Sequence, residues 1–177
     1  MSLRLVLIAL LLMVAGCGQT AKPGTATPEA AMPDDFVGEI SYRNGSVAPP
    51  YHYEWRVAFD TEAAHLTWSP GYEGTETWTE TVELGADERA RFHNQLSSAG
   101  LFEFTEDTDD GLVGGPTGRA TFGQEPDVFY DSGTLGTSEA GQDMLDEVVA
   151  ATKGVFPGEV WADMASRQSA WEQRQPK

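Results

Sequence analysis

Three histidines are the residues of this 177-residue chain best suited to bind a metal or to exchange a proton near neutral pH. They are His52, His65 and His93, and no two of them have the spacing of a zinc-binding HExxH helix. His52 and His65 share the polar face of a predicted hairpin but are not opposite one another in either register. The sequence therefore gives only weak support for a metal site, and we expect no metal and no cofactor.

Ser138 is the one candidate for a nucleophile. The segment Gly136-Thr137-Ser138-Glu139-Ala140 is similar to the nucleophile elbow of serine hydrolases, which requires glycine where Ala140 stands. In that fold the histidine follows the serine, whereas all three histidines here precede it. Ser138 fits better as the N-cap of a helix, so we predict no catalytic residue and a protein that is not an enzyme.

An acidic run over residues 103–111 suggests calcium. When Gly111 is aligned with the glycine of an EF-hand, Thr117 falls where a bidentate glutamate is required, so the EF-hand is excluded. An irregular calcium loop remains an alternative to a solvated loop. The glycine-rich segment 111–118 lacks the Lys-Ser/Thr of a phosphate loop and is typical of a turn.

The N-terminus carries the most specific motif. Arg4 precedes an apolar run over residues 5–15, which suits a signal-peptide core but falls short of the ~20 apolar residues that span a bilayer. The run ends in Val14-Ala15-Gly16-Cys17, which resembles the lipobox of bacterial lipoproteins. The resemblance implies that residues 1–16 are a signal peptide and that Cys17 becomes a lipid-bearing N-terminus, with acyl chains such as palmitate.

This resemblance also predicts a location. A lipid on Cys17 would hold the protein on a membrane of the cell envelope, with the rest of the chain outside the cytoplasm. Gly18, rather than an aspartate, follows the cysteine, which favours the outer membrane if the source has one. Cys17 is the only cysteine and has no partner in the chain for a disulfide.

The remainder divides into a tether and one domain. Residues 17–35 are the lipidated cysteine and a segment rich in Pro, Thr, Ala and Gly, which favours a flexible tether. Residues 36–177 have the length of a single globular domain. A net charge of −17 argues against binding of nucleic acid or anionic lipid through the protein surface.

Alternation predicts strands in the first half of the domain. In residues 51–60 the apolar positions are Tyr51, Tyr53, Trp55, Val57 and Phe59. Period two over ten residues is typical of a half-buried strand. Residues 64–68 are predicted to return as the second arm of a hairpin. Further strands are predicted over residues 37–42, 75–84, 119–122 and 128–131.

Helices are predicted mainly in the second half. One should run from Asp87 to just before Gly100, a second should start after Ser138, and Pro157 should open a third. This order predicts an α+β fold, with an antiparallel sheet of about four to six strands and two or three helices packed mainly on one face. The face of the sheet away from the helices should be exposed to solvent. Its predicted lining is His52, Glu54, Arg56, His65 and Thr67.

Candidate binding residues come from two loops at the ends of the sheet. Tyr72 follows Pro70-Gly71 and is the aromatic residue least expected to be buried. Asp107, Asp109 and Asp110 could attract a cationic partner over a long range. We therefore expect a non-enzymatic binding or interaction domain, with a protein or cell-wall partner and no nucleic acid.

The element order of the first half, up to a helix ending at Ala99-Gly100-Leu101-Phe102, loosely resembles emfourin-like inhibitors of metallopeptidases. That resemblance makes a peptidase inhibitor the alternative function, and an envelope hydrolase is a further alternative. The glycine pair of the family's first strand is absent near Asn44-Gly45, so no residue role is transferred.

Overall fold

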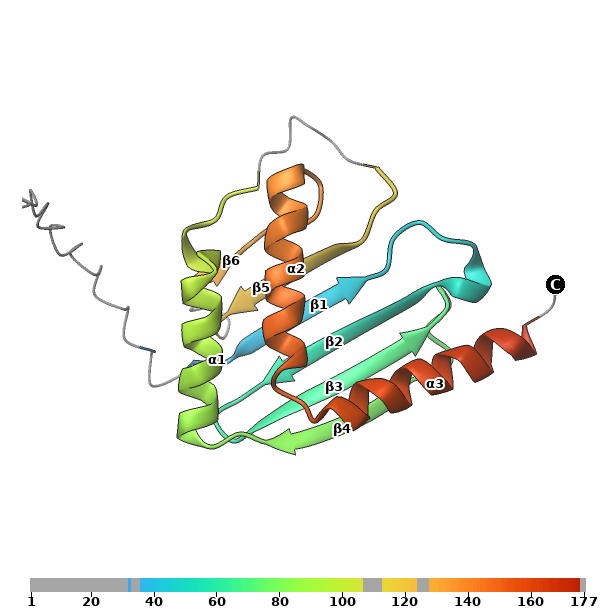
Figure 1. The fold of residues 1–177 in the computed structure, drawn as a ribbon, viewed down its shortest axis with the longest axis horizontal. Coiled ribbons are helices and arrows are strands. Elements are labelled where there is room, and N and C mark those ends of the chain that lie inside the picture. Colours follow the sequence, from blue (N-terminus) through green and yellow to red (C-terminus); the bar gives the residue numbers. More distant parts are fainter. Residues whose placement is uncertain (1–31, 33–35, 107–112, 124–127, 176–177) are drawn as a thin grey trace, which may run out of the picture.

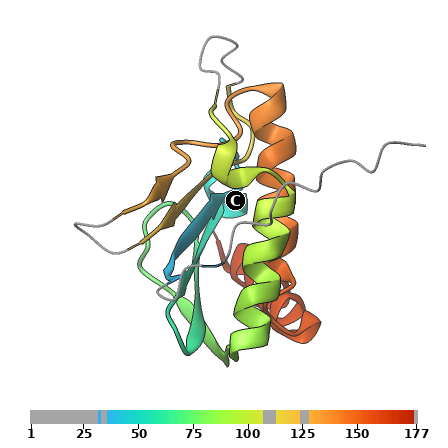
Figure 2. The same cartoon turned by 90° about the vertical axis from the view of Figure 1, so that its left-hand side faces the viewer.

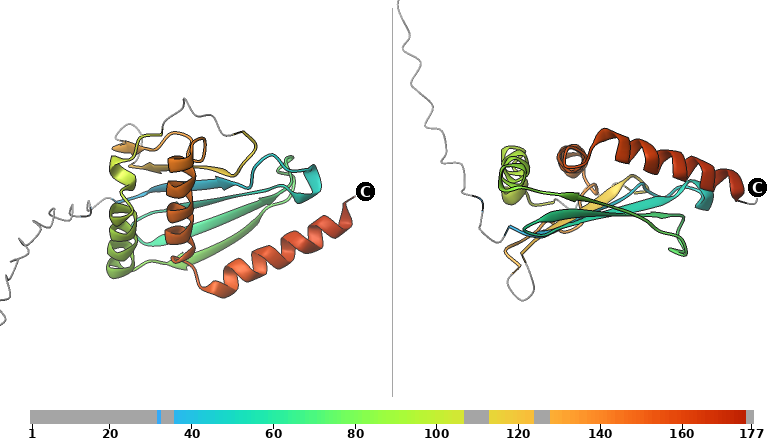
Figure 3. Two further views of the ribbon diagram at one scale, coloured as in Figure 1. Left: turned by 45° about the horizontal axis from the view of Figure 1, so that its top comes forward. Right: turned by 90° about the horizontal axis from the view of Figure 1, so that it is seen from below.

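The computed structural model describes residue 32 and residues 36–106, 113–123 and 128–175. Six strands form one antiparallel sheet in the order β4-β3-β2-β1-β5-β6, and three α-helices cross it (Figure 1). Viewed from below, all three helices lie on the same side of the sheet (Figure 3). This arrangement confirms the predicted α+β fold.

The strands are β1 Gly38–Arg43, β2 Tyr53–Phe59, β3 Ala63–Pro70, β4 Trp78–Glu83, β5 Thr117–Phe122 and β6 Tyr130–Asp131. The helices are α1 Ala86–Ser98, α2 Glu139–Lys153 and α3 Gly158–Arg174, and two short 3-10 turns are η1 Pro49–Tyr51 and η2 Leu101–Glu103. Each of the six predicted strands and three predicted helices is present, with shifted ends.

Alternation along the strands produces the core. In β2, Trp55, Val57 and Phe59 are buried and pair with the buried Trp68, Leu66 and Ala64 of β3. Because neighbouring residues in a strand point to opposite faces, the residues between them point away from the helices. The prediction that these residues of the hairpin share the buried face of the sheet is confirmed.

Capping residues set the start of α2 and the end of α1. The Ser138 hydroxyl accepts a hydrogen bond from the Gly141 amide at 2.9 Å, so Ser138 is the N-cap of α2 as predicted. Gly100, the second residue after α1, adopts a left-handed φ of 82° that favours glycine. Seen from the side, α1 and α2 stand next to each other against one face of the sheet (Figure 2).

Helix α3 is joined to the sheet by a buried amide. The Gln168 side-chain oxygen accepts a hydrogen bond from the Trp68 indole at 3.1 Å, and its amide nitrogen lies 3.4 Å from the His52 carbonyl oxygen. A buried amide is stabilising when both of its ends are satisfied, as here. The bonds fix α3 over the end of β2 and β3.

Two predictions about the hairpin are wrong. Tyr51 was expected to face the core, but it lies in the turn η1 and is 59% exposed, because Pro49 and Pro50 end the extended chain before β2. His52 was expected on the wet face, but it is fully buried, because the ring of Tyr72 covers it.

The two ends of the sheet differ. The chain enters the domain at Phe36, whose ring stacks on Phe122 with centroids 5.1 Å apart, just before β1 begins. At the other end of β1, residues 44–52 form the connection to β2, close to the C-terminal part of α3 (Figure 1). The proposed binding residue Tyr72 lies at this second end, away from Phe36.

Trp55 and Arg56, neighbours on opposite faces of β2, test this arrangement. Trp55→Ala should lower the free energy of unfolding by about 3–5 kcal/mol, because it empties a buried aromatic site. Arg56→Ala should lower it by less than about 1 kcal/mol, because it removes one exposed ion pair. Urea denaturation followed by circular dichroism measures both, and equal small effects would contradict the burial of Trp55.

Candidate functional site

Among the hollows on the surface of the described residues, two contain residues that were predicted from the sequence to lie in a binding loop or on the face of the sheet away from the helices. The first, here called the sheet-end hollow, has a volume of about 520 Å³. Its lining is Pro49, Pro50, Pro70, Gly71, Tyr72, Glu73, Thr75, Trp171 and Gln175. Tyr72 is 51% exposed, which confirms the prediction that it is not buried.

Tyr72 is held in place by contacts on two sides. Its ring stacks on the ring of His52 with centroids 3.7 Å apart and an angle of 8°. Its hydroxyl donates a hydrogen bond to the Val47 carbonyl at 2.8 Å. Gly71 allows the turn before it with a φ of 70°, and the Trp171 ring fills the place of its missing side chain. The exposed face of Tyr72 is therefore preorganised for contact.

His52 and Glu54 connect this hollow to the open face of the sheet, which is the face that the helices do not cover. The His52 Nε2 atom lies 3.1 Å from Glu54 Oε1, and the same oxygen accepts a hydrogen bond from Arg43 Nε at 2.7 Å. Nδ1 of His52 is buried and has no hydrogen-bond partner among the described residues. Glu54 thus contacts both the imidazole under Tyr72 and an arginine of the open face.

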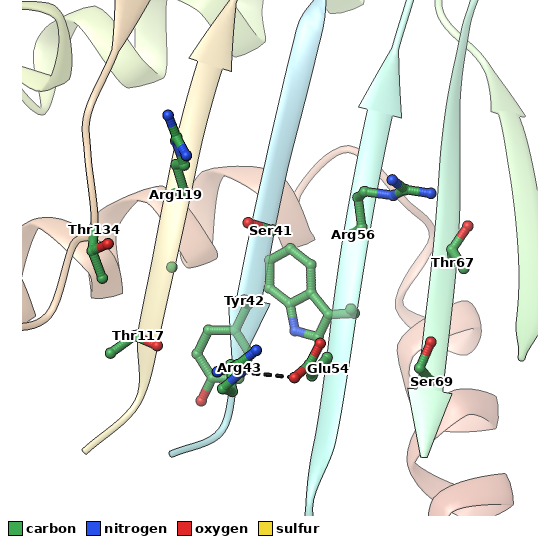
Figure 4. A pocket seen from close by; sticks show the side chains of 12 residues that line it. Ser41, Tyr42, Arg43, Glu54, Arg56, Thr67, Ser69, Thr117, Arg119 and Thr134 are labelled. Atoms are coloured by element: carbon green, nitrogen blue, oxygen red, sulfur yellow. Dashed lines mark hydrogen bonds and ion pairs between the residues drawn. The ribbon is translucent and has the colours of Figure 1, made fainter. Parts of the chain in front are cut away.

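The second hollow, here called the polar hollow, lies on the open face of the sheet and has a volume of about 430 Å³ (Figure 4). Its lining from this face is Ser41, Arg43, Glu54, Arg56, Thr67, Ser69, Thr117, Arg119 and Thr134, with Tyr42, Trp55 and Gly118 beneath. The hydroxyl and guanidinium groups make this surface a hydrogen-bonding one.

The strand register places the central polar side chains in one row. Ser41 of β1 is paired with Arg56 of β2 on one side and with Arg119 of β5 on the other. Arg56 is in turn paired with Thr67 of β3. Directly paired side chains lie about 5 Å apart on one face of a sheet, so the row is continuous across four strands.

The three arginines differ in how firmly they are held. Arg43 is bonded to Glu54 at 2.7 Å. Arg119 makes a two-point contact with Asp131, and this contact lowers the pKa of the Asp131 carboxyl. Arg56 reaches Glu39 only at 3.5 Å, with 58% of its side chain exposed. Arg56 is therefore the most available cation of the polar hollow.

The flanks of the acidic loop can be placed, but its central acids cannot. Asp107, Asp109 and Asp110 lie outside the described residues, as does Cys17. Before them, the Glu106 carboxylate accepts a hydrogen bond from Thr137 at 2.9 Å and fills the space beside Gly141, in the first turn of α2. After them, the Gly114 carbonyl accepts a bond from the Ser46 amide at 3.1 Å.

The three histidines do not lie together in the structure. His65 lies 3.1 Å from the Thr81 hydroxyl on the open face, and His93 packs against Phe36 in the core. In residues 36–106, 113–123 and 128–175, no three His, Cys, Asp or Glu side chains are grouped as a metal site requires. Ser138 is buried, and its hydroxyl is used in the helix cap.

No protein-family model matches the chain, and a search of curated proteins gives no match. None of the helices in the described part of the chain combines the length and the apolar character needed to cross a bilayer. A function is therefore inferred from the two hollows.

Sequence reasoning identified Tyr72 but missed the polar hollow. Alternation placed Glu54, Arg56 and Thr67 on one face, which the structure confirms. It could not place Ser41 and Arg119 beside them, because the pairing of β1 with β5 joins segments far apart in the sequence. The sequence signal that was available is the polar residue at every second position of each strand.

Two half-buried tyrosines give a prediction at alkaline pH. Burial, aided by the neighbouring Tyr53, raises the pKa of Tyr42 from 10.0 to about 12, and burial beside Asp131 raises the pKa of Tyr130 to about 12. Above pH 10 the unfolded chain loses these protons first, so their contribution to stability is present below pH 10 and lost towards pH 12.

Urea denaturation between these pH values should therefore show a falling free energy of unfolding. Tyr42→Phe and Tyr130→Phe should each make the fall shallower, and absorbance titration should lose one late-ionising phenol per variant. A double variant that is destabilised as steeply as the unmodified protein would contradict the burial of these hydroxyls.

Proposed function

We propose that this chain is a lipid-anchored protein of the bacterial cell envelope whose domain binds another envelope protein without catalysing a reaction. In this proposal Cys17 carries the lipid, residues 17–35 are the tether, and the sheet-end hollow with its rim is the contact surface. The location is the outer membrane if the source has one.

The observation that carries the proposal is a cluster of exposed apolar side chains at one end of the sheet. Val47, Tyr51 and Tyr72 are 36%, 59% and 51% exposed and all belong to the surroundings of the sheet-end hollow. Exposed apolar clusters rimmed by polar residues are typical of protein interaction sites, and tyrosine is among the residues that contribute most to binding.

Rigidity favours binding at this place. Tyr72 is stacked on His52 and bonded through its hydroxyl, so little side-chain entropy remains to be lost when a partner covers it. Trp171 and the prolines of the hollow are similarly restricted. A preorganised aromatic surface supports a binding role.

Position and charge are consistent with the proposal. The contact surface lies at the end of the sheet opposite Phe36, where the tether would join the domain (Figure 1). An anchored domain could therefore present this surface away from the membrane. The net charge of −17, to which Asp107, Asp109 and Asp110 contribute, favours a partner with a cationic surface.

Lipidation is tested at the cysteine. Cys17→Ser should abolish incorporation of a radiolabelled or clickable fatty acid, because serine offers no thiol for the lipid. The unprocessed precursor, which keeps residues 1–16, should accumulate. Label retained by the serine variant would exclude Cys17 as the lipid site.

The contact surface is tested by photo-crosslinking in intact cells. A photoreactive phenylalanine analogue in place of Tyr51 should yield a discrete adduct. The matched control places the same analogue at Phe129, which is 49% exposed and bonded through its amide to Phe122 at the tether end of the sheet. The control position should yield no adduct.

Tyr72→Ala, combined with the probe at position 51, should lower the yield of the adduct about tenfold or more, as expected for a central interface residue. Tyr72→Phe keeps the stacked ring and should preserve most of the adduct. Equal adducts from positions 51 and 129, or an adduct insensitive to Tyr72→Ala, would refute the sheet-end contact.

A further inference from the structure

The polar hollow points to a second ligand, distinct from the partner proposed for the sheet end. We propose that it binds an acidic saccharide, a sugar ring that carries one carboxylate. In this arrangement Arg56 pairs with the carboxylate, and the neighbouring hydroxyl side chains bond to the hydroxyls of the ring.

The lining matches a hydroxyl-rich ligand. Five of its side chains end in a hydroxyl on the open face, Ser41, Thr67, Ser69, Thr117 and Thr134. A hydroxyl both donates and accepts hydrogen bonds, so it complements the hydroxyls of a sugar at any orientation. The volume of about 430 Å³ lies within the range of ligand-sized sites.

The polar hollow is less acidic than the chain as a whole. Its three arginines face three carboxylates, Glu54 in the lining and the ion-pair partners Glu39 and Asp131, whereas the whole chain has 11 basic residues against 28 acidic ones. A hollow with balanced charges does not repel an anion as an acidic surface does, so an anionic ring can approach its guanidinium groups.

The ion pairs indicate one negative charge on the sugar ring that lies in the polar hollow. Arg43 and Arg119 are already bonded to carboxylates of the protein, the first at 2.7 Å and the second by two contacts. Arg56 has one partner at 3.5 Å and an exposed side chain, so it can turn to a ligand at little cost. One available guanidinium matches one carboxylate, which it can bind with two parallel hydrogen bonds.

The strand pairing brings hydroxyls to the same point. Ser41 and Thr67 are the direct partners of Arg56 on its two neighbouring strands, and the close view shows Arg56 between them (Figure 4). A carboxylate held by Arg56 therefore places the adjoining ring atoms within reach of both side chains. Ser69 extends the hydroxyl surface along β3 towards Glu54.

Calorimetry of the full chain in detergent micelles tests the site, with trigalacturonic acid as the probe. Arg56→Gln should weaken binding about tenfold or more, as expected for a lost charge-assisted pair. Arg91→Gln is the matched control, because it makes the same charge change on an exposed residue of α1, on the other side of the sheet. It should leave the affinity within about twofold, because Arg91 lies outside the lining.

Thr67→Val provides a second variant that keeps the charge and the shape of the side chain. It should weaken binding severalfold by removing one hydroxyl. Raising the salt concentration should weaken binding of the acid by the unmodified protein, since the exposed arginine is screened. Maltotriose, a neutral trisaccharide, should bind much more weakly than the acid.

Three comparative results would overturn the inference. They are equal binding of the neutral and acidic trisaccharides, tighter binding of galactose 6-phosphate than of galacturonic acid, and equal losses from Arg56→Gln and Arg91→Gln. The absence of binding at millimolar trigalacturonic acid would overturn it as well. None of these results bears on the crosslinked adduct from position 51, so each proposal is tested independently of the other.

Discussion

The burial of one face of the sheet beneath the three helices determines what the remaining surface can do. Trp55, Val57 and their partners on β3 are covered by helices, and the Gln168 amide fixes α3 over them. A sheet that is apolar on one face alone needs no second layer, because polar side chains on its other face can remain in water. The side chains of the open face are thus not needed for packing and remain accessible to solvent or to a ligand.

Two surfaces of different chemistry meet at Glu54. Its carboxylate contacts Arg43 in the polar hollow and the buried His52, on which Tyr72 stacks. The apolar rim and the hydrogen-bonding face are therefore built on a shared set of contacts, although each has its own ligand in our proposals. Such sharing explains why His52, a polar side chain, is buried at this point: its ring supports Tyr72 while one nitrogen is satisfied by a carboxylate.

Local patterns in the sequence were sufficient for the elements and for much of the core. The alternation of β2 and the cap at Ser138 depend on neighbouring residues, so they can be recognised without a structure. Tyr51 and His52 were misassigned, because a proline turn and a ring from a later loop override the alternation. The row from Thr67 to Arg119 depends on pairing between distant strands, which no local pattern specifies.

The placement of the two ends has a mechanical consequence. In the proposed anchored state, a pull from the membrane would enter β1 at the buried Phe36, and a bound partner would resist it beyond the other end of the same strand. β1 is flanked by β2 and β5, and the hydrogen bonds of antiparallel pairs are perpendicular to the strands. The load would therefore run along β1, and withdrawing this strand from the sheet would require both ladders to shear at once instead of opening one bond at a time. Such a geometry would make the domain a durable link between the membrane and whatever it holds.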